Sequence, residues 1–162
     1  MKNQKSFISL MKSPRLITSI LLVGLICFSA VSCDLFEQRS RAYDGPPKVE
    51  FFPTSDVVDE GSGELNVQVQ LIGSQRSQDT SVEYTVVDSM TTAQEGTHYS
   101  LQTSSPVTIP ANSSETTVTI DVTGTGLSSG ESRTLQLALI GNDQVETGPN
   151  IRFFDLVIQG QD

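Results

Sequence analysis

The chain has 162 residues, with 10 Lys plus Arg against 19 Asp plus Glu, and its formal net charge is −9 at pH 7. Four of the positive charges and none of the negative ones lie in residues 1–32, so the remainder carries a net charge of about −13. Such a field repels nucleic acid and anionic lipid, which bind proteins through Lys and Arg, and it argues against any nucleic-acid partner.

The first 32 residues predict an export signal. They begin with basic residues and continue with an apolar stretch at positions 16–30. This stretch is shorter than the roughly 20 residues that a membrane-spanning helix needs. A basic start, a short apolar core and small residues at its end are typical of a signal peptide, although an ordinary secretion signal and an uncleaved anchor remain alternatives.

Residues 30–33 read AVSC and resemble the lipobox of bacterial lipoproteins, in which the cysteine is acylated and becomes the first mature residue. The resemblance implies lipid attachment, including palmitate, at Cys33, and a place at the outer membrane of a Bacteroidota-type envelope. Ala30 stands where the motif most often has Leu. Several acyl chains would make the anchorage effectively permanent, because each buried methylene contributes about 0.8 kcal/mol. Cys27 would leave with the signal, so the mature monomer could form no disulfide.

Residues 33–47 are expected to form the lipidated N-terminus and a tether. The stretch DLFEQRSRAYDGPP has no sustained periodicity and ends in Gly45-Pro46-Pro47. As a flexible coil it would span on the order of 20 Å. The sequence therefore predicts a signal peptide at 1–32, a tether at 33–47 and one folded domain at 48–162.

The folded part alternates apolar and polar residues, the pattern of half-buried strands, with turn residues between the runs. KVEFFP is expected to open the domain as an edge strand that Pro53 stops. The Phe pairs at 51–52 and 153–154 are expected in core and edge packing, with Phe153 and Val157 partly covered. The other residues predicted to point inward are Leu65, Val67, Val69, Leu71, Val82, Tyr84, Val86, Val107, Ile109, Val118, Ile120, Val122, Leu135, Leu137, Leu139, Phe154, Leu156 and Ile158.

Apolar residues do not recur at helical spacing over any ten residues of the folded part. Strands with one apolar and one polar face require two sheets packed face to face. The sequence therefore predicts an all-β, immunoglobulin-like sandwich of about seven strands. The likeness is architectural, because residues 48–162 lack the cysteine pair and the buried Trp of antibody-type domains.

Six stretches carry a closer resemblance: VEFF, VVDEGSGELNVQVQL, SVEYTV, TAQEGTHYS, VTIPANSSETTVTIDV and GESRTLQLAL, in this order. Together these stretches resemble a Calx-beta domain, the sandwich module of sodium–calcium exchangers and many bacterial surface proteins. The resemblance covers residues 48–162 and implies the same sandwich fold.

The resemblance also implies a possible metal site, because some Calx-beta domains bind calcium through acids at one end of the sandwich. Glu60 matches the acidic-Gly position, Glu131 the acid that opens the sixth strand, and Asp162 the acids that end the last strand. Calcium takes about 6–8 oxygen ligands. His98 replaces a usual Asp, and residues 124–127 lack the usual acidic run. We therefore expect no cofactor, with calcium at these three residues as the alternative.

Catalysis is not expected. His98 is the single histidine, and no Gly-x-Ser-x-Gly turn accompanies it. We expect His98 to cap its own loop, and the paired carboxylates Asp59 and Glu60 lack the cleft that a glycosidase needs.

The leading hypothesis is a lipid-anchored, non-enzymatic envelope protein that binds an envelope protein or a glycan through polar loops at 73–81, 88–105 and 141–150. One alternative is a calcium-binding Calx-beta module. Another is an accessory subunit of an envelope enzyme or glycan-handling complex.

Overall fold

The computed structural model describes residue 43 and residues 45–124 and 126–161. The predicted signal peptide, Cys33 and Asp162 lie outside the described residues. Within the described part of the chain, no helix is long and apolar enough to cross a membrane.

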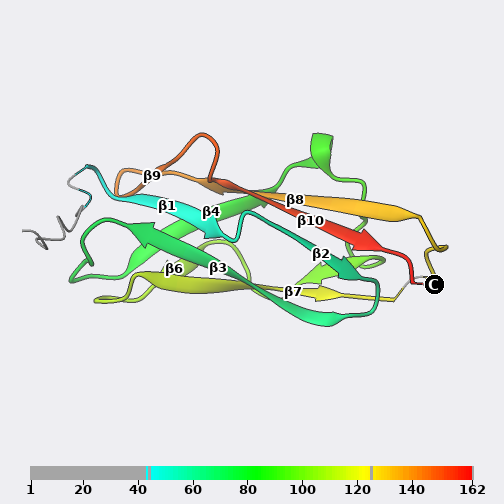
Figure 1. Cartoon of the computed structure of the whole chain (residues 1–162). Coiled ribbons are helices and arrows are strands. Elements are labelled where there is room, and N and C mark those ends of the chain that lie inside the picture. Colours follow the sequence, from blue (N-terminus) through cyan, green and yellow to red (C-terminus); the bar gives the residue numbers. More distant parts are fainter. Residues whose placement is uncertain (1–42, 44, 125, 162) are drawn as a thin grey trace, which may run out of the picture. The chain divides into compact units, whose positions relative to one another are not determined.

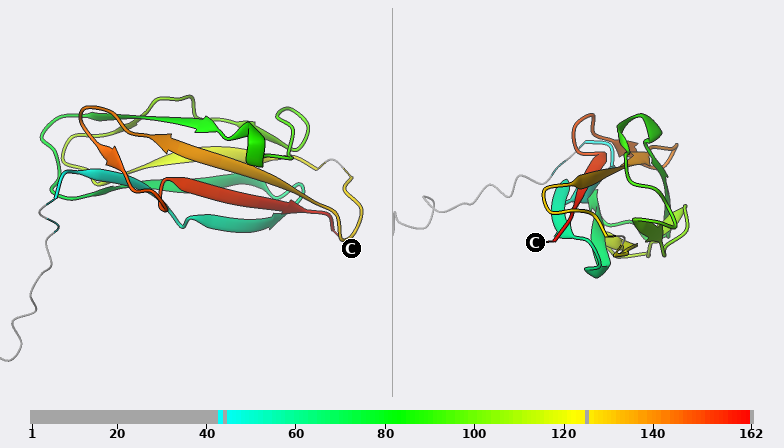
Figure 2. Two further views of the ribbon diagram at one scale, coloured as in Figure 1. Left: turned by 90° about the horizontal axis from the view of Figure 1, so that it is seen from above. Right: turned by 90° about the vertical axis from the view of Figure 1, so that its right-hand side faces the viewer.

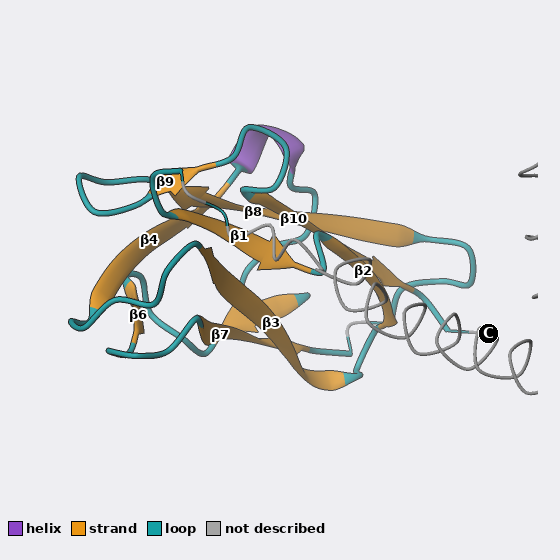
Figure 3. Cartoon of the chain, turned by 60° about the vertical axis from the view of Figure 1, so that its left-hand side comes forward, coloured by secondary structure: helices purple, strands orange, loops and turns teal. Residues whose placement is uncertain are grey.

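The described residues contain ten strands and one 3-10 turn, and the strands form two five-stranded sheets (Figures 1 and 3). Sheet A has the order β5-β7-β3-β1-β9, and sheet B has the order β2-β10-β8-β4-β6. The end-on view in Figure 2 shows the two layers facing each other. The elements are β1 (Lys48–Phe52), β2 (Ser55–Asp59), β3 (Gly63–Ile72), β4 (Thr80–Val86), η1 (Asp88–Met90), β5 (Tyr99–Leu101), β6 (Val107–Ile109), β7 (Glu115–Val122), β8 (Ser132–Ile140), β9 (Glu146–Thr147) and β10 (Phe153–Gln159).

One apolar core fills the space between the sheets, and the predicted sandwich is confirmed. Phe51 of β1 and Phe154 of β10 meet across it with ring centroids 5.8 Å apart. Every residue predicted to point inward is buried, except Leu65 and Val86, which are partly buried against the core. Phe153 and Val157 are half-buried, as predicted. The period-two alternation of the sequence thus predicted which side chains are buried in the core.

Three short strands were not predicted, and the prediction that β1 is an edge strand is wrong. After Pro53 the chain crosses to sheet B, where β2 pairs in parallel with β10. The two residues of β9 pair in parallel with Lys48 and Val49, so β9 takes the edge beside β1. β5 adds three residues beside β7. β5 and β9, with three and two residues, show little alternation, and the SDVVD sequence of β2 places two apolar residues side by side.

The loops at 88–105 and 141–150 therefore contain η1, β5 and β9, and the first loop ends where β4 begins at Thr80. The expected packing of Phe52 is also wrong, because this side chain is 57% exposed. It is the last residue of β1 and lies on the face of the strand opposite to Phe51, away from the core.

The two ends of the sandwich carry different segments. β1 starts at the N-terminal end, where Lys48 pairs with Ile72 of β3, and the Pro47 carbonyl accepts a hydrogen bond from the Glu146 amide at 2.9 Å. β2 and β10 finish at the opposite end, where Asp59 pairs with Gln159. Figure 1 shows these ends at the left and right of the molecule.

Candidate functional site

Three segments meet at the end of the sandwich opposite to the start of β1. We call this region the loop end, and it comprises residues 60–62 after β2, residues 123–131 after β7 (position 125 is not described) and residues 160–161 after β10. The Glu60 amide donates to the Gln159 carbonyl at 2.9 Å, and the Gly160 amide donates to the Glu131 carbonyl at 3.0 Å. A Cβ atom at position 160 would collide with the carbonyl groups of Leu127 and Ser128, so the close approach requires glycine.

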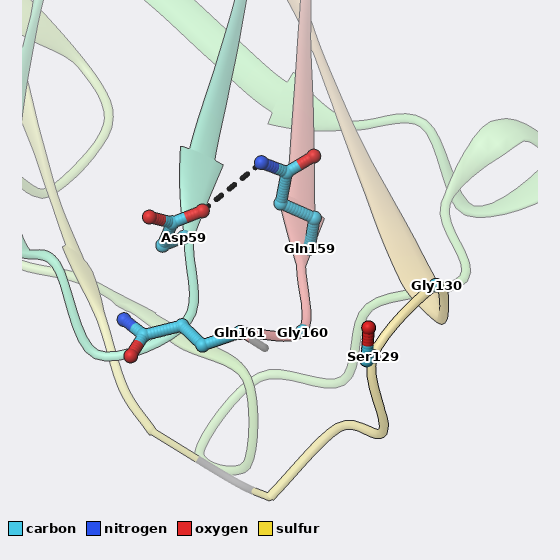
Figure 4. Close-up of a pocket in the computed structure, with 6 residues that line it drawn as sticks. All are labelled: Asp59, Ser129, Gly130, Gln159, Gly160 and Gln161. Carbon is cyan, nitrogen blue, oxygen red and sulfur yellow. Dashed lines mark hydrogen bonds between the residues drawn. The ribbon is translucent and has the colours of Figure 1, made fainter.

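An open, polar pocket of about 590 Å³ lies at the loop end (Figure 4). In Figure 4 the Asp59 carboxylate and the Gln159 amide point toward each other, and Gln159 Nε2 donates to Asp59 Oδ1 at 3.0 Å. Gln161 Nε2 donates to the Glu60 carbonyl at 3.2 Å. The pocket is lined by Asp59, Ser129, Gly130, Gln159, Gly160 and Gln161. Amide, hydroxyl and carboxylate groups of this kind can donate and accept hydrogen bonds with a polar ligand.

Glu60 and Glu131 reach adjoining residues of the β7–β8 connection. Glu60 Oε2 accepts a hydrogen bond from the Leu127 amide at 3.0 Å. Glu131 Oε2 accepts one from the Ser128 amide, also at 3.0 Å. Two of the three predicted acids, Glu60 and Glu131, therefore lie at one end of the sandwich, where both carboxylates bind the backbone of the same loop.

The described residues provide two of the three carboxylates predicted to bind calcium, Glu60 and Glu131. Each of the two carboxylates already accepts a backbone amide, whereas calcium takes about 6–8 oxygen ligands. Among the residues with described positions, no group of three or more His, Cys, Asp or Glu side chains could hold a metal ion. Asp162, the third predicted ligand, lies outside the described residues, so its part in a calcium site stays a prediction.

His98 caps its own loop, as predicted. Its Nδ1 accepts a hydrogen bond from the Gln94 amide at 3.0 Å, and its own amide donates to the Gln94 carbonyl at 2.8 Å. His98 is 8% exposed. The imidazole therefore stabilises the connection that leads into β5.

Two buried tyrosines lie near this connection. Burial raises the pKa of Tyr99 above its usual 10.0, and the negative charges of Glu95 and Asp88 raise it further. Burial and Glu95 likewise raise the pKa of Tyr84, whose hydroxyl donates to the Thr103 carbonyl. Both phenols therefore stay protonated at neutral pH.

Sequence reasoning missed the pocket residues Gln159, Gly160 and Gln161. They come together with Asp59 only because β2 pairs in parallel with β10 across about 100 residues of chain. The one local signal was a glycine directly after the last strand.

A comparison with curated protein sequences finds no significant match. Among solved structures, the fold is similar to the CBD12 region of CALX1.2, with 22% identity and a TM-score of 0.58 over 71% of this chain and 44% of that one. It is also similar to the apo form of the Calx CBD1 domain, with 21% identity and a TM-score of 0.58 over 73% of this chain and 100% of that one.

A third similar structure is a putative carbohydrate binding protein from Bacteroides ovatus ATCC 8483, with 14% identity and a TM-score of 0.52 over 69% of this chain and 36% of that one. The chain thus spans less than half the length of the CALX1.2 and Bacteroides ovatus structures. At these identities the likeness supports the predicted Calx-beta-like fold alone. The family relationship is shown by a sequence profile. The profile of the family described as "Domain of unknown function (DUF4843)" matches residues 51–155. The chain therefore belongs to the DUF4843 family.

Proposed function

We propose that the protein is a non-enzymatic binding module, anchored by lipid on Cys33 to the outer membrane of a bacterial envelope. The observation that carries the proposal is the position of the pocket. It lies at the loop end, whereas the chain enters the sandwich at the other end, through Pro47 and β1.

An anchor at Cys33 would attach the domain to the membrane through the end of the sandwich opposite to the pocket. Residues 34–47 would be the tether predicted from the sequence, and the carbonyl of its last residue, Pro47, accepts the hydrogen bond from the Glu146 amide. The strands then carry the chain from one end of the domain to the other, and the ten residues of β3 alone extend about 33 Å. The loop end would be the part of the domain that a partner meets first.

The chemistry of the pocket favours a polar partner. Its lining offers amides, a hydroxyl and one carboxylate without an aromatic ring, which suits hydrogen bonding to a glycan or to a polar loop of an envelope protein. The Bacteroides ovatus neighbour is described as a putative carbohydrate binding protein, which is a reason to test glycans first.

The anchorage is tested by metabolic labelling with a palmitate analogue. We expect label on the wild-type protein and none on Cys33→Ser, and we expect Cys33→Ser to leave the membrane fraction. Protease shaving of intact cells then shows which side the domain faces. Wild-type protein whose mature N-terminus is unmodified would contradict the anchor.

Binding at the loop end is tested by crosslinking in cells followed by purification of the protein. We expect recovered partners to be lost in Gln161→Arg, which places a long cation in the pocket. They should be kept in the matched control Gln144→Arg, whose exposed side chain lies in the β8–β9 connection at the N-terminal end. An unchanged set of partners in both variants would contradict binding through the loop end. Reproducible recovery of an enzyme would support the accessory-subunit alternative.

A calcium-responsive module is the second candidate, because Glu60 and Glu131 both hold the β7–β8 connection. Calcium that bound there would stiffen this loop and raise the thermal midpoint of unfolding, and a chelator would reverse the rise. Calorimetric titration of the full chain with calcium chloride decides the matter. Heat at micromolar metal that Glu60→Gln abolishes would support the candidate, and a titration without heat would rule it out.

A further inference from the structure

The outer face of sheet A carries an ordered pattern of polar side chains. Strand pairing places its residues in five rows that run across β1, β3 and β7, of which the first is Lys48-Ile72 at the N-terminal end. Of the four rows that follow it, the first and the last are acidic, and the two between them are uncharged. In order, these four rows are Glu50-Gln70-Glu115, then Phe52-Gln68-Thr117, then Asn66-Thr119, then Glu64-Asp121. We call Phe52, Gln68, Thr117, Asn66 and Thr119 the neutral strip.

Hydrogen bonds fix the amides of this face before any ligand arrives. Gln70 Nε2 donates to Gln68 Oε1 at 3.0 Å, and Gln68 Nε2 donates in turn to a carboxylate oxygen of Glu115. Thr119 Oγ1 donates to Asn66 Oδ1 at 2.8 Å. Because that bond uses only the amide oxygen of Asn66, its NH2 group remains directed to donate. Preorganised donors and acceptors lower the entropy that a ligand must overcome.

Phe52 is the one aromatic residue of the strip. It lies at the β1 margin, paired with Gln68, and 57% of its surface is exposed. A flat apolar ring beside amides and hydroxyls offers a surface on which the C–H face of a sugar can pack while its hydroxyls bond to the amides. Adjacent strands lie about 4.8 Å apart, so the three strands give a strip about 10 Å wide.

Charge narrows the choice of occupant. Carboxylates border the strip on both sides, and the nearest described cation on this face, Lys48 of β1, has its Nζ 3.9 Å from Glu146. These charges repel anionic glycans and phosphate headgroups. They also oppose a second copy, since a symmetric contact would bring acids against acids. A protein partner would favour an apolar, aromatic or Arg-rich centre, whereas the centre of this strip holds amides and hydroxyls and its one aromatic ring, Phe52, lies at the margin.

We propose that the neutral strip is a binding site for an uncharged polysaccharide. The site is separate from the pocket at the loop end, so the proposal goes beyond the function argued above. Phe52 provides the packing surface, and Gln68 and Asn66 provide the hydrogen bonds. The acidic rows exclude anionic chains.

Affinity electrophoresis of the full chain in detergent tests the proposal. The gels contain galactomannan or xyloglucan as neutral probes, or polygalacturonate as the anionic one. We expect a neutral probe to retard the wild-type protein and polygalacturonate to leave it unaffected. Phe52→Ala should weaken the retardation about tenfold, the loss expected for an aromatic anchor. Thr117→Lys, which fills the strip with a long cationic side chain, should abolish it.

Val57→Ala is the matched control, because Val57 is 58% exposed but lies on β2 of sheet B. It should bind as the wild type does, and thermal midpoints should show all variants folded. No retardation by either neutral probe, equal retardation by polygalacturonate, or binding unchanged in both Phe52→Ala and Thr117→Lys would overturn the proposal. So would a dimer in sedimentation velocity that Thr117→Lys dissociates. Retardation that survives these variants but is lost in Gln161→Arg would overturn the strip and leave binding at the loop end intact.

Discussion

The interior of the sandwich and its loop end are stabilised by different kinds of contact. In the interior, large apolar side chains from both sheets lose essentially all exposure to water, and the hydrophobic effect acts on each of them. At the loop end, hydrogen bonds that the Glu60 and Glu131 carboxylates accept from backbone amides, together with the close approach at Gly160, hold the segments together. The interior should therefore dominate stability, whereas substitutions at the loop end should act locally and more weakly.

The largest effect is expected in the interior. Phe51→Ala or Phe154→Ala should each lower the free energy of unfolding by about 3–5 kcal/mol, because each removes a fully buried ring and leaves a cavity. Urea denaturation measures the loss. Phe52→Ala is the control from the neighbouring position, and its exposed ring should cost less than about 0.5 kcal/mol. Equal losses at positions 51 and 52 would show that the assignment of faces on β1 is wrong.

The next effect should come from the backbone packing of the loop end. Gly160→Ala should cost about 1–3 kcal/mol, because the new Cβ meets the Leu127 and Ser128 carbonyls and the segments must separate. Gly124→Ala is the matched control at the same end, since its Cβ would lie 3.6 Å from the Gly61 Cα, an ordinary contact. Urea denaturation should separate the two variants, and hydrogen exchange should show the loosening confined to the loop end. Identical stability of both would contradict the close approach at Gly160.

A smaller effect is expected for the carboxylates that hold the β7–β8 connection. Glu60→Ala should lower the free energy of unfolding by about 1 kcal/mol, because the Leu127 amide loses its acceptor. Glu60→Gln keeps a carbonyl oxygen and should lose less. The exposed Glu83 of β4 provides a control, and Glu83→Gln should be neutral. If Glu60→Ala proves as stable as the wild type, the hydrogen bond contributes nothing measurable.

These two regions also differ in how much the sequence reveals. The core could be predicted because alternation is a local signal. The prediction failed in degree at Leu65 and Val86, which are partly rather than fully buried, and it was wrong at the exposed Phe52. The cap at His98 could be predicted because its partner, Gln94, is four residues away. The pocket could not be predicted, because Asp59 and Gln159 are 100 residues apart in the chain and meet only through the parallel pairing of β2 with β10. The five residues of β2 are too few to indicate which sheet they join.

The smallest effect concerns pH and comes from two buried tyrosines. Tyr84 and Tyr99 have pKa values above 10.0 in the folded protein, chiefly because of burial, with Glu95 adding to both. Above about pH 10 the unfolded chain therefore binds fewer protons than the folded one, and the free energy of unfolding falls as pH rises. Below about pH 10 both phenols are protonated in the folded and in the unfolded chain, so they do not make the free energy of unfolding depend on pH. Urea denaturation between pH 8 and 11 should show this decline, and absorbance at 295 nm should report the ionisation.

Removing the phenol groups tests whether they cause the decline. Tyr99→Phe should flatten it, since the ring stays buried and the titrating group is gone. Tyr84→Phe should flatten it too, but it should also cost about 1 kcal/mol at pH 8, because the hydrogen bond to the Thr103 carbonyl is lost. If the double variant loses stability above pH 10 as steeply as the wild type, other groups cause the alkaline sensitivity. In that case the interior tolerates the two phenolates, and the polar contacts outside the core would set the pH limit of the fold.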